Sequence, residues 1–317
     1  MTLFALGSCR TDSSNPVVPK SEPPSPEQFV QDILDQTSLD SLEYSVNQLS
    51  GAASITVNGV TNTITSRFPT YNGHALAIAY LTQRLASYGL NPAVDSFTSQ
   101  AIPQYNHGAN VTARKPGTDQ PNYLCILCAH YDAEPSVPGA DDNASGTAVV
   151  LEAARILSRY QTRYTIVFAF WDEEELGIYG SEYFATKIPA SNDSVVGVIN
   201  MDMLGYDSND DGKMDIHTID VGRSTSLADT LVYIIRKYQL ALSPIVYNPG
   251  TYDSDHASFW THQYSAVVFS EAYYGGDFNP HYHTVQDKID YFNPKFFLNC
   301  SKLGIATISL LASASPR

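Results

Sequence analysis

The sequence has few basic residues, few cysteines and no long apolar run. Its 317 residues include 18 Lys and Arg against 33 Asp and Glu, which gives a net charge of −15 at pH 7. This balance excludes the basic surface with which proteins bind nucleic acid, so no nucleic-acid partner is expected. No apolar stretch approaches the roughly 20 residues that a membrane-spanning helix needs. Hydrophobic residues still make up 43% of the chain, which is enough for a sizeable core and excludes wholesale disorder.

The four cysteines are too few for a disulfide framework in a chain of this length. Cys125 and Cys128 have C-x-x-C spacing, but they lie in an apolar run that is typical of a buried strand. Side chains three positions apart in a strand point to opposite faces, which argues against a redox or zinc pair. We therefore predict two buried thiols that behave as small apolar residues.

Cys9 has a different context. Residues 3–9 resemble the end of a bacterial lipoprotein signal, although a basic segment is missing and the apolar stretch is short. Residues 10–27 are rich in Ser, Pro, Asn and Glu, as in a flexible tether. We expect a signal remnant and tether over residues 1–27 and a single domain over residues 28–317. The protein is then exported, to the periplasm, the outer membrane or the medium, and a lipid on Cys9 would be its only membrane attachment.

The apolar patterning predicts an α/β fold. Helical spacing of apolar residues occurs over residues 27–49, 71–90, 144–160 and 294–311. Continuous apolar runs, typical of strands buried on both faces, occur over residues 124–129, 164–171, 195–201 and 266–269. The order strand, helix, strand between residues 124 and 171 indicates parallel pairing. We therefore expect an α/β fold with a mainly parallel sheet.

Polar side chains follow each predicted strand where the strand ends. His130 and Asp132 follow the first, residues 172–175 the second, Asp202 the third and residues 270–271 the fourth, while a loop before the helix brings Asp141. Ligands of open α/β sheets bind at the carboxyl ends of the strands, so these groups should converge. Carboxylates gathered without Lys or Arg repel one another and need a cation. Histidine combined with carboxylate favours zinc or a similar transition metal.

Five short motifs carry a family resemblance. They are A-H-Y-D at 129–132, G-A-D-D-N-A-S-G at 139–146, E-E-L-G at 174–177, N-M-D-M at 200–203 and H-T-V-Q-D at 283–287. Their order and spacing resemble the zinc aminopeptidase family that also contains the glutaminyl cyclases. The similarity spans about residues 55–310. It implies a phosphorylase/hydrolase-like zinc exopeptidase fold, which has three layers, α/β/α, with a central mixed and mostly parallel sheet. It also implies a co-catalytic pair of zinc ions.

Carried over residue by residue, the resemblance implies the site. His130 and Asp202 would hold one zinc ion, Glu175 and His283 the other, and Asp141 would bridge the two. A metal-bridging hydroxide would attack the substrate.

The same resemblance implies the remaining roles. Glu174 would act as the general base that takes a proton from the water and returns it to the leaving amine. Asp132 would accept the second imidazole N–H of His130 and fix its tautomer. A looser likeness at residues 252–259 marks Tyr252 as a transition-state contact. The remaining candidates for histidine ligands are interpreted as non-ligands, namely His107, His217, His256, His262 and His281.

Residues 207–215 have the D-x-N-x-D-G spacing of a calcium loop. The twelfth position, however, is Thr218 and not the usual bidentate glutamate. The alternative is a polar hairpin turn with Asp-Gly as its turn signal. Both interpretations stay open at the level of the sequence.

The sequence thus predicts a monomeric metallo-exopeptidase that removes N-terminal residues from peptides. The alternative is a glutaminyl cyclase, a single-zinc acyltransferase of the same fold, and a third hypothesis is a binding domain without catalysis. The cyclases typically lack the D-D-x-A-S-G pattern, which is intact here at residues 141–146. This pattern favours two metals and hydrolysis.

Overall fold

A computed structural model describes residues 26–99, 101–102 and 107–315. The expected signal remnant and most of the expected tether, including Cys9, lie outside the described residues. Helices in the described part of the chain lack the combination of length and apolar character that crossing a bilayer requires.

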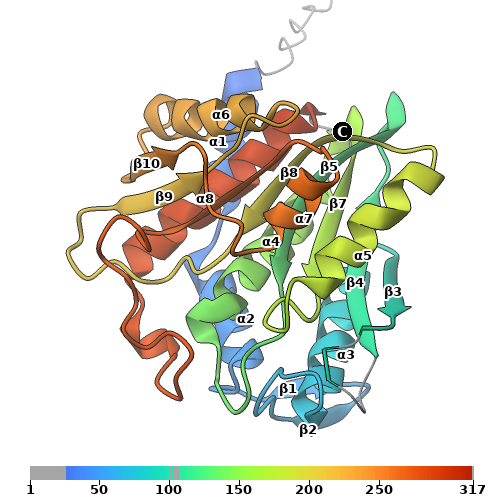
Figure 1. Ribbon diagram of the computed structural model, residues 1–317, viewed down its shortest axis with the longest axis vertical. Helices are drawn as coiled ribbons and strands as arrows, with labels where there is room; N and C mark the ends of the chain where they lie inside the picture. Colours follow the sequence, from blue (N-terminus) through green and yellow to red (C-terminus); the bar gives the residue numbers. More distant parts are fainter. Residues whose placement is uncertain (1–25, 100, 103–106, 316–317) are drawn as a thin grey trace, which may run out of the picture.

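The centre of the fold is an eight-stranded sheet with the order β10-β9-β11-β8-β5-β7-β4-β3 (Figure 1). The pairs β5–β7, β5–β8, β8–β11 and β9–β10 are parallel, whereas β3–β4, β4–β7 and β9–β11 are antiparallel. The strands are β3 (Pro92–Phe97), β4 (Gly108–Lys115), β5 (Gln120–His130), β7 (Tyr164–Trp171), β8 (Ser194–Met201), β9 (Lys213–His217), β10 (Ser243–Tyr247) and β11 (Ala266–Glu271). The predicted mixed and mostly parallel sheet is confirmed.

Helices cover both faces of this sheet, as Figure 1 shows. One face packs against α3 (Asn72–Ser87), α4 (Gly146–Leu157), α6 (Ser224–Lys237) and α8 (Pro294–Leu311), with α1 (Pro26–Gln36) and α2 (Leu39–Leu49) outside them. The other face packs against the shorter helices α5 (Tyr179–Lys187) and α7 (His256–Thr261). The three layers predicted from the sequence are therefore present.

Short elements complete the described chain. They are the hairpin of β1 (Ile55–Val57) and β2 (Val60–Asn62), the pair β6 (Gln161–Thr162) and β12 (Ala314–Ser315), the π-helical turn η1 (Ala140–Ser145), and the 3₁₀ turns η2 (Ile188–Ala190) and η3 (Ile289–Tyr291). Of these, only η1 matters for the site, because it follows β5 and leads directly into α4.

The side chains of β5 show how the two faces alternate. Cys125 and Leu127 belong to the hydrophobic core on the α4 and α8 side, whereas Ile126 and Cys128 belong to the core on the α5 and α7 side. Both cysteines are free and buried, and burial raises the pKa of Cys125 to about 12. The prediction of two buried thiols on opposite faces is confirmed.

Three neighbouring strands deliver the polar residues to one edge. In the order β8-β5-β7 the strands are parallel, and they end at Met201, His130 and Trp171. The segments that follow these strands therefore begin side by side. This arrangement brings residues that are far apart in sequence to the same place.

Candidate metal centre

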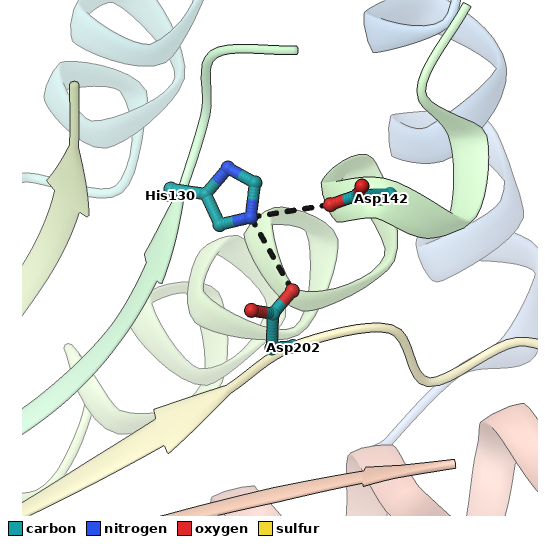
Figure 2. Close-up of side chains that lie close together, drawn as sticks. All are labelled: His130, Asp142 and Asp202. Carbon is teal, nitrogen blue, oxygen red and sulfur yellow. Dashed lines mark hydrogen bonds and ion pairs between the residues drawn. The ribbon is translucent and has the colours of Figure 1, made fainter. Parts of the chain in front are cut away.

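The first group of potential metal ligands surrounds His130, the last residue of β5. Its Nε2 atom lies 3.3 Å from Oδ1 of Asp142 and 3.3 Å from Oδ1 of Asp202 (Figure 2). Asp202 directly follows β8, and Asp142 lies in η1. The side chain of His130 is 1% exposed, so these contacts are shielded from water.

A second group surrounds His283, in the segment that follows β11. Its Nε2 atom lies 3.0 Å from Oδ2 of Asp142 and 3.1 Å from Oε2 of Glu175. The carboxylate of Asp142 thus presents one oxygen to each histidine. One carboxylate between two sets of nitrogen and oxygen donors is the arrangement of a bridged pair of metal sites.

The expectation that Asp141 occupies this bridging position is wrong. Its Oδ1 accepts the N–H of Gly205 at 2.7 Å, and its Oδ2 accepts the side-chain amide of Asn279 at 2.8 Å. The backbone leaves helical geometry at Asp142, with φ −104° and ψ 94°. The two adjacent carboxylates therefore point to different partners, and Asp142 takes the position predicted for Asp141.

Two side chains from elsewhere in the fold hold η1 in place. The carboxylate of Asp287 accepts the backbone N–H groups of Asp141 and Asp142, at 2.9 and 3.1 Å. The guanidinium of Arg67, which is fully buried, donates to four backbone carbonyls, those of Leu49, Tyr131, Pro138 and Gly139, at 2.6–2.9 Å. Arg67 was not predicted from the sequence, because nothing in its local pattern indicates contacts so distant in the chain.

Asp132 connects the first group to the loop after β7. Its two oxygens accept the N–H groups of Glu174 and Glu175, each at 3.2 Å. The nearer oxygen also lies 3.4 Å from Nδ1 of His130, which is long for a hydrogen bond. Asp132 is therefore on the predicted side of the imidazole ring, but its short contacts are to the loop.

Glu174 lies at the edge of the first group. Its Oε2 is 3.9 Å from Nε2 of His130. Burial raises the pKa of Glu174 well above its ordinary value, and His130 opposes this effect. A carboxyl group beside the donors and not among them has the position that a proton-transferring residue needs.

Two further residues near the ligands were missed in the sequence. Ser254 donates to Oδ2 of Asp202 at 2.7 Å and so fixes the orientation of this carboxylate. Glu134 lies 3.9 Å from Nδ1 of His283, on the side of the ring away from Asp142. The only sequence signal for Glu134 is its place two residues after Asp132. The five histidines interpreted as non-ligands belong to neither group.

The electrostatics of the two groups fit a divalent cation. Burial and the charge of Asp142 raise the pKa of Glu175 to about 8. Burial alone would lower the pKa of His283, but its contacts with Asp142 and Glu175 raise it to about 10. Among the described residues, Lys and Arg form no ion pair with the carboxylates of either group. Protonated histidines therefore supply the positive charge here, and imidazole with carboxylate is a donor set that suits zinc.

A cleft opens beside the two groups. Its lining includes the ligand carboxylates and also His217, Thr251, Asp253, Tyr273 and Tyr274. Tyr282 also lines it and stacks on His283, with ring centroids 3.6 Å apart. The expected contact residue Tyr252 is 52% exposed and is absent from the lining among the described residues, although both of its neighbours are present.

The acidic loop at residues 207–215 has its own partners. Asp207 accepts the N–H groups of Asp211 and Gly212, Asp211 pairs with Lys213 at 2.7 Å, and Asp215 accepts the N–H of Tyr274. In the described part of the chain, the clusters of potential metal ligands do not include these acids. The hairpin alternative is wrong, because β9 pairs with β10 and β11 and not with a strand just before it. Calcium binding stays a prediction without support from these contacts.

The model of Peptidase family M28 matches residues 110–308, which is more than half of the chain. A probable zinc metalloprotease of Pyrenophora teres f. teres is 28% identical over 232 residues, which cover 66% of this chain and 47% of that protein. The chain thus spans about half the length of the curated relatives it matches.

Solved structures share the fold. The LapA aminopeptidase of Legionella pneumophila matches with a TM-score of 0.76 and 23% identity, over 99% of this chain and 80% of its own. A glutaminyl cyclase of Bacteroides thetaiotaomicron matches with a TM-score of 0.68 and 18% identity, over 86% of this chain and 98% of its own. At such identities the likeness shows the fold alone. The match of the family model over residues 110–308, which include both groups of potential ligands, shows that the chain belongs to peptidase family M28.

Proposed function

We propose that the chain is a zinc-dependent aminopeptidase that acts on peptides and binds two zinc ions. The observation that carries the proposal is the position of Asp142, whose two oxygens face His130 and His283. His130, Asp142 and Asp202 would hold one ion, and His283, Asp142 and Glu175 the other. Membership of a peptidase family and the likeness of the fold to that of an aminopeptidase support this assignment.

Different residues of the chain have different roles in hydrolysis. When bound, the zinc ions would polarise the scissile carbonyl and lower the pKa of a water molecule. Glu174 takes the proton from the attacking water and returns it to the leaving amine. Asp132 accepts the backbone N–H groups of Glu174 and Glu175 and so fixes the positions of the base and of a ligand relative to each other. Ser254 keeps Asp202 oriented toward the first site.

Metal content together with substrate turnover separates this proposal from its alternatives. Two zinc ions per chain and hydrolysis of leucine anilide would support the aminopeptidase. One zinc ion and cyclisation of an N-terminal glutamine would instead identify a glutaminyl cyclase. A chain without metal and without turnover would be a binding domain. The two donor sets that share Asp142 favour the first outcome.

The role of Glu174 has its own test, in the variant Glu174→Ala. We expect both zinc ions to stay bound and turnover to fall by about 10²–10⁴-fold, the usual contribution of a general base. Zinc is measured by mass spectrometry of the metal and turnover with leucine anilide. Glu182→Ala, which removes a partly exposed glutamate paired with His262, serves as the control. Unchanged turnover in Glu174→Ala would refute the assigned base.

We also propose that the protein is exported, with a lipid on Cys9. The support is the sequence of residues 3–27 alone, since this segment lies outside the described residues. Mass spectrometry of the protein from its native host tests the proposal. An intact and unmodified Met1 would contradict both the lipid and the processed signal.

A further inference from the structure

One wall of the cleft is built from three separate segments of the chain, whose side chains contact one another. His217 ends β9, Thr251 and Asp253 precede α7, and Tyr274 follows β11. These side chains line the same cleft as Asp142, Glu175 and Asp202. If the N-terminal residue of a substrate is held at the metal groups, the side chain of that residue therefore lies in the cleft that this wall lines.

Asp253 is the charged group of this wall. Its Oδ2 accepts hydrogen bonds from the hydroxyl of Tyr274, at 3.1 Å, and from the hydroxyl of Thr251. Both hydroxyls are neutral, and in the described part of the chain Lys and Arg form no ion pair with Asp253. Bound zinc ions would balance the ligand carboxylates, whereas the charge of Asp253 has no such partner. This carboxylate is exposed, so it is accessible to a cation that enters the cleft.

The rest of the wall consists of two aromatic rings, those of His217 and Tyr274, and of Thr251, and carries no positive charge at neutral pH. Burial lowers the pKa of His217 to about 4, and its Nδ1 accepts the N–H of Thr251 at 3.3 Å. The ring of His217 contacts the ring of Tyr274 edge to face, with centroids 5.2 Å apart. Aromatic rings favour cations over their faces and cover alkyl chains well. The wall thus offers contacts for both parts of a long cationic side chain.

The wall is also held in place from behind. Asp215 is fully buried, and its Oδ2 accepts the N–H groups of Tyr274 and Gly275 at 2.6 and 3.2 Å. The acid that ends the D-x-N-x-D-G loop thus anchors the segment that carries Tyr274. A preformed wall binds with a smaller loss of conformational entropy than a mobile one.

We propose that this wall makes the cleft selective for substrates whose N-terminal residue is lysine or arginine, with Asp253 as the specificity-determining residue. The apolar side chains of Met203 and Val268, which also line the cleft, would contact the alkyl stem. The charged end would pair with Asp253. This inference rests on the proposed aminopeptidase function.

The experiment compares two substrates of nearly equal shape, the aminocoumarin amides of lysine and norleucine, with zinc-loaded enzyme. We expect kcat/KM for the lysine substrate to exceed that for norleucine by about 2- to 5-fold, the range that an ion pair with the solvent-exposed carboxylate of Asp253 would contribute. In Asp253→Asn the ratio should fall to near one. Tyr274→Phe, which removes one hydroxyl from Asp253, should lower the ratio by a smaller factor.

Asp229→Asn is the matched control, because Asp229 is an exposed acid on α6 outside the lining of this cleft. The wild-type ratio should persist in it. A wild-type ratio near one, or a ratio that survives Asp253→Asn, would overturn the inference while leaving the aminopeptidase function intact. Absence of turnover with both substrates in zinc-loaded wild-type enzyme would instead overturn the proposed function.

Discussion

Asp132 links the metal group around His130 to the loop that carries the proposed base. It is fully buried and accepts two backbone N–H groups, those of Glu174 and Glu175. In Asp132→Asn one of the two oxygens becomes a donor amide, which faces one of these N–H groups and cannot accept from it. We expect zinc affinity to fall by about 10-fold or more, as is common when a partner of the ligands is lost.

Competition with a chelator of known affinity measures this change in zinc binding. Turnover at saturating zinc should fall as well, because the backbone of Glu174 loses its anchor. A variant that binds zinc and turns over substrate like the wild type would contradict the role of Asp132. The variant Asp229→Asn, which replaces an exposed acid on α6, provides the reference for the change of charge alone.

The adjacent aspartates in η1 can be distinguished by paired variants. In Asp142→Asn we expect at least one of the two zinc ions to be lost, because the bridging carboxylate is gone. In Asp141→Asn both ions should remain, since its oxygens bond to Gly205 and Asn279. That variant should lose about 1–3 kcal/mol of unfolding free energy, since an amide replaces a buried acceptor. Metal analysis measures the zinc content of each variant, and thermal unfolding measures its stability. Equal zinc loss in both variants would contradict the assignment.

These two residues also show what a motif leaves undecided. The G-A-D-D-N-A-S-G sequence indicates a ligand loop, but it contains two neighbouring acids of the same type. Which of them faces the histidines depends on the backbone dihedral angles at Asp142, and these are fixed by contacts with Asp287 and Arg67 from elsewhere in the chain. His130, Glu175, Asp202 and His283 lie at or after the ends of four different strands, and the motif order distinguishes Glu175 from the adjacent Glu174 and His283 from His281.

At the scale of elements, η1 depends on Arg67 for its position. The variant Arg67→Met keeps much of the side-chain volume but removes the donors to four buried or partly buried carbonyls. We expect the unfolding free energy to fall by about 3 kcal/mol or more, because unsatisfied buried acceptors are costly. For a domain of this size the midpoint of thermal unfolding should fall on the order of 10 °C. Scanning calorimetry of the metal-free protein measures both quantities.

Arg114→Met is the control for this variant. Arg114 is about half exposed and pairs with Asp193 at the surface, so its loss should cost within about 1 kcal/mol. Similar unfolding midpoints for the two variants would show that Arg67 does not anchor the loop. Zinc binding in Arg67→Met then reports how far the position of η1 determines the metal sites.

The elements that the sequence predicted best are those buried on both faces or on a long apolar stripe. The predicted strand 164–171 and helix 294–311 coincide with β7 and α8. The sheet edges were missed, since most residues of β3 are exposed and β10 is only partly covered. Such strands lack a continuous apolar run, and their pairing with β4 and β9 stabilises them. Arg67 and Glu134 were missed for a related reason, because their partners are set by tertiary structure.

The charge of the whole molecule is unevenly distributed between surface and interior. Much of the formal net charge of −15 lies inside the molecule, because eleven acids but only two basic residues, Arg67 and Lys115, are buried in the described part of the chain, several of the acids at the metal centre and beside η1. The buried acids have no Lys or Arg in ion pairs among the described residues, apart from Glu152 with Arg155. The folded chain therefore holds repelling carboxyl groups together, and protons or metal ions must relieve this repulsion. Stability should consequently depend on both pH and metal.

The sign of this dependence follows from the shifted groups. The pKa values of Glu175 and Asp287 are raised to about 8, mainly by burial, and that of His283 is raised to about 10. For a group with a raised pKa, the folded chain binds more protons than the unfolded chain at any pH between the group's unfolded and folded pKa values. The free energy of unfolding therefore falls as pH rises through that range. His217 and His256 have lowered pKa values, of about 4 and 3, so they affect the pH dependence of stability only below about pH 6.5. Above that pH the metal-free protein should lose stability steadily.

We therefore expect the unfolding midpoint of the metal-free protein to fall between pH 6.5 and pH 9. Zinc should reverse this trend, because its ligands bind in their deprotonated forms and the ion balances their charge. The stabilisation by a fixed excess of zinc should thus be larger at pH 8 than at pH 6. Calorimetry with and without a chelator measures both effects, and Asp142→Asn should show a much smaller response to zinc. A metal-free midpoint that rises across this range would contradict the raised pKa values of Glu175, Asp287 and His283.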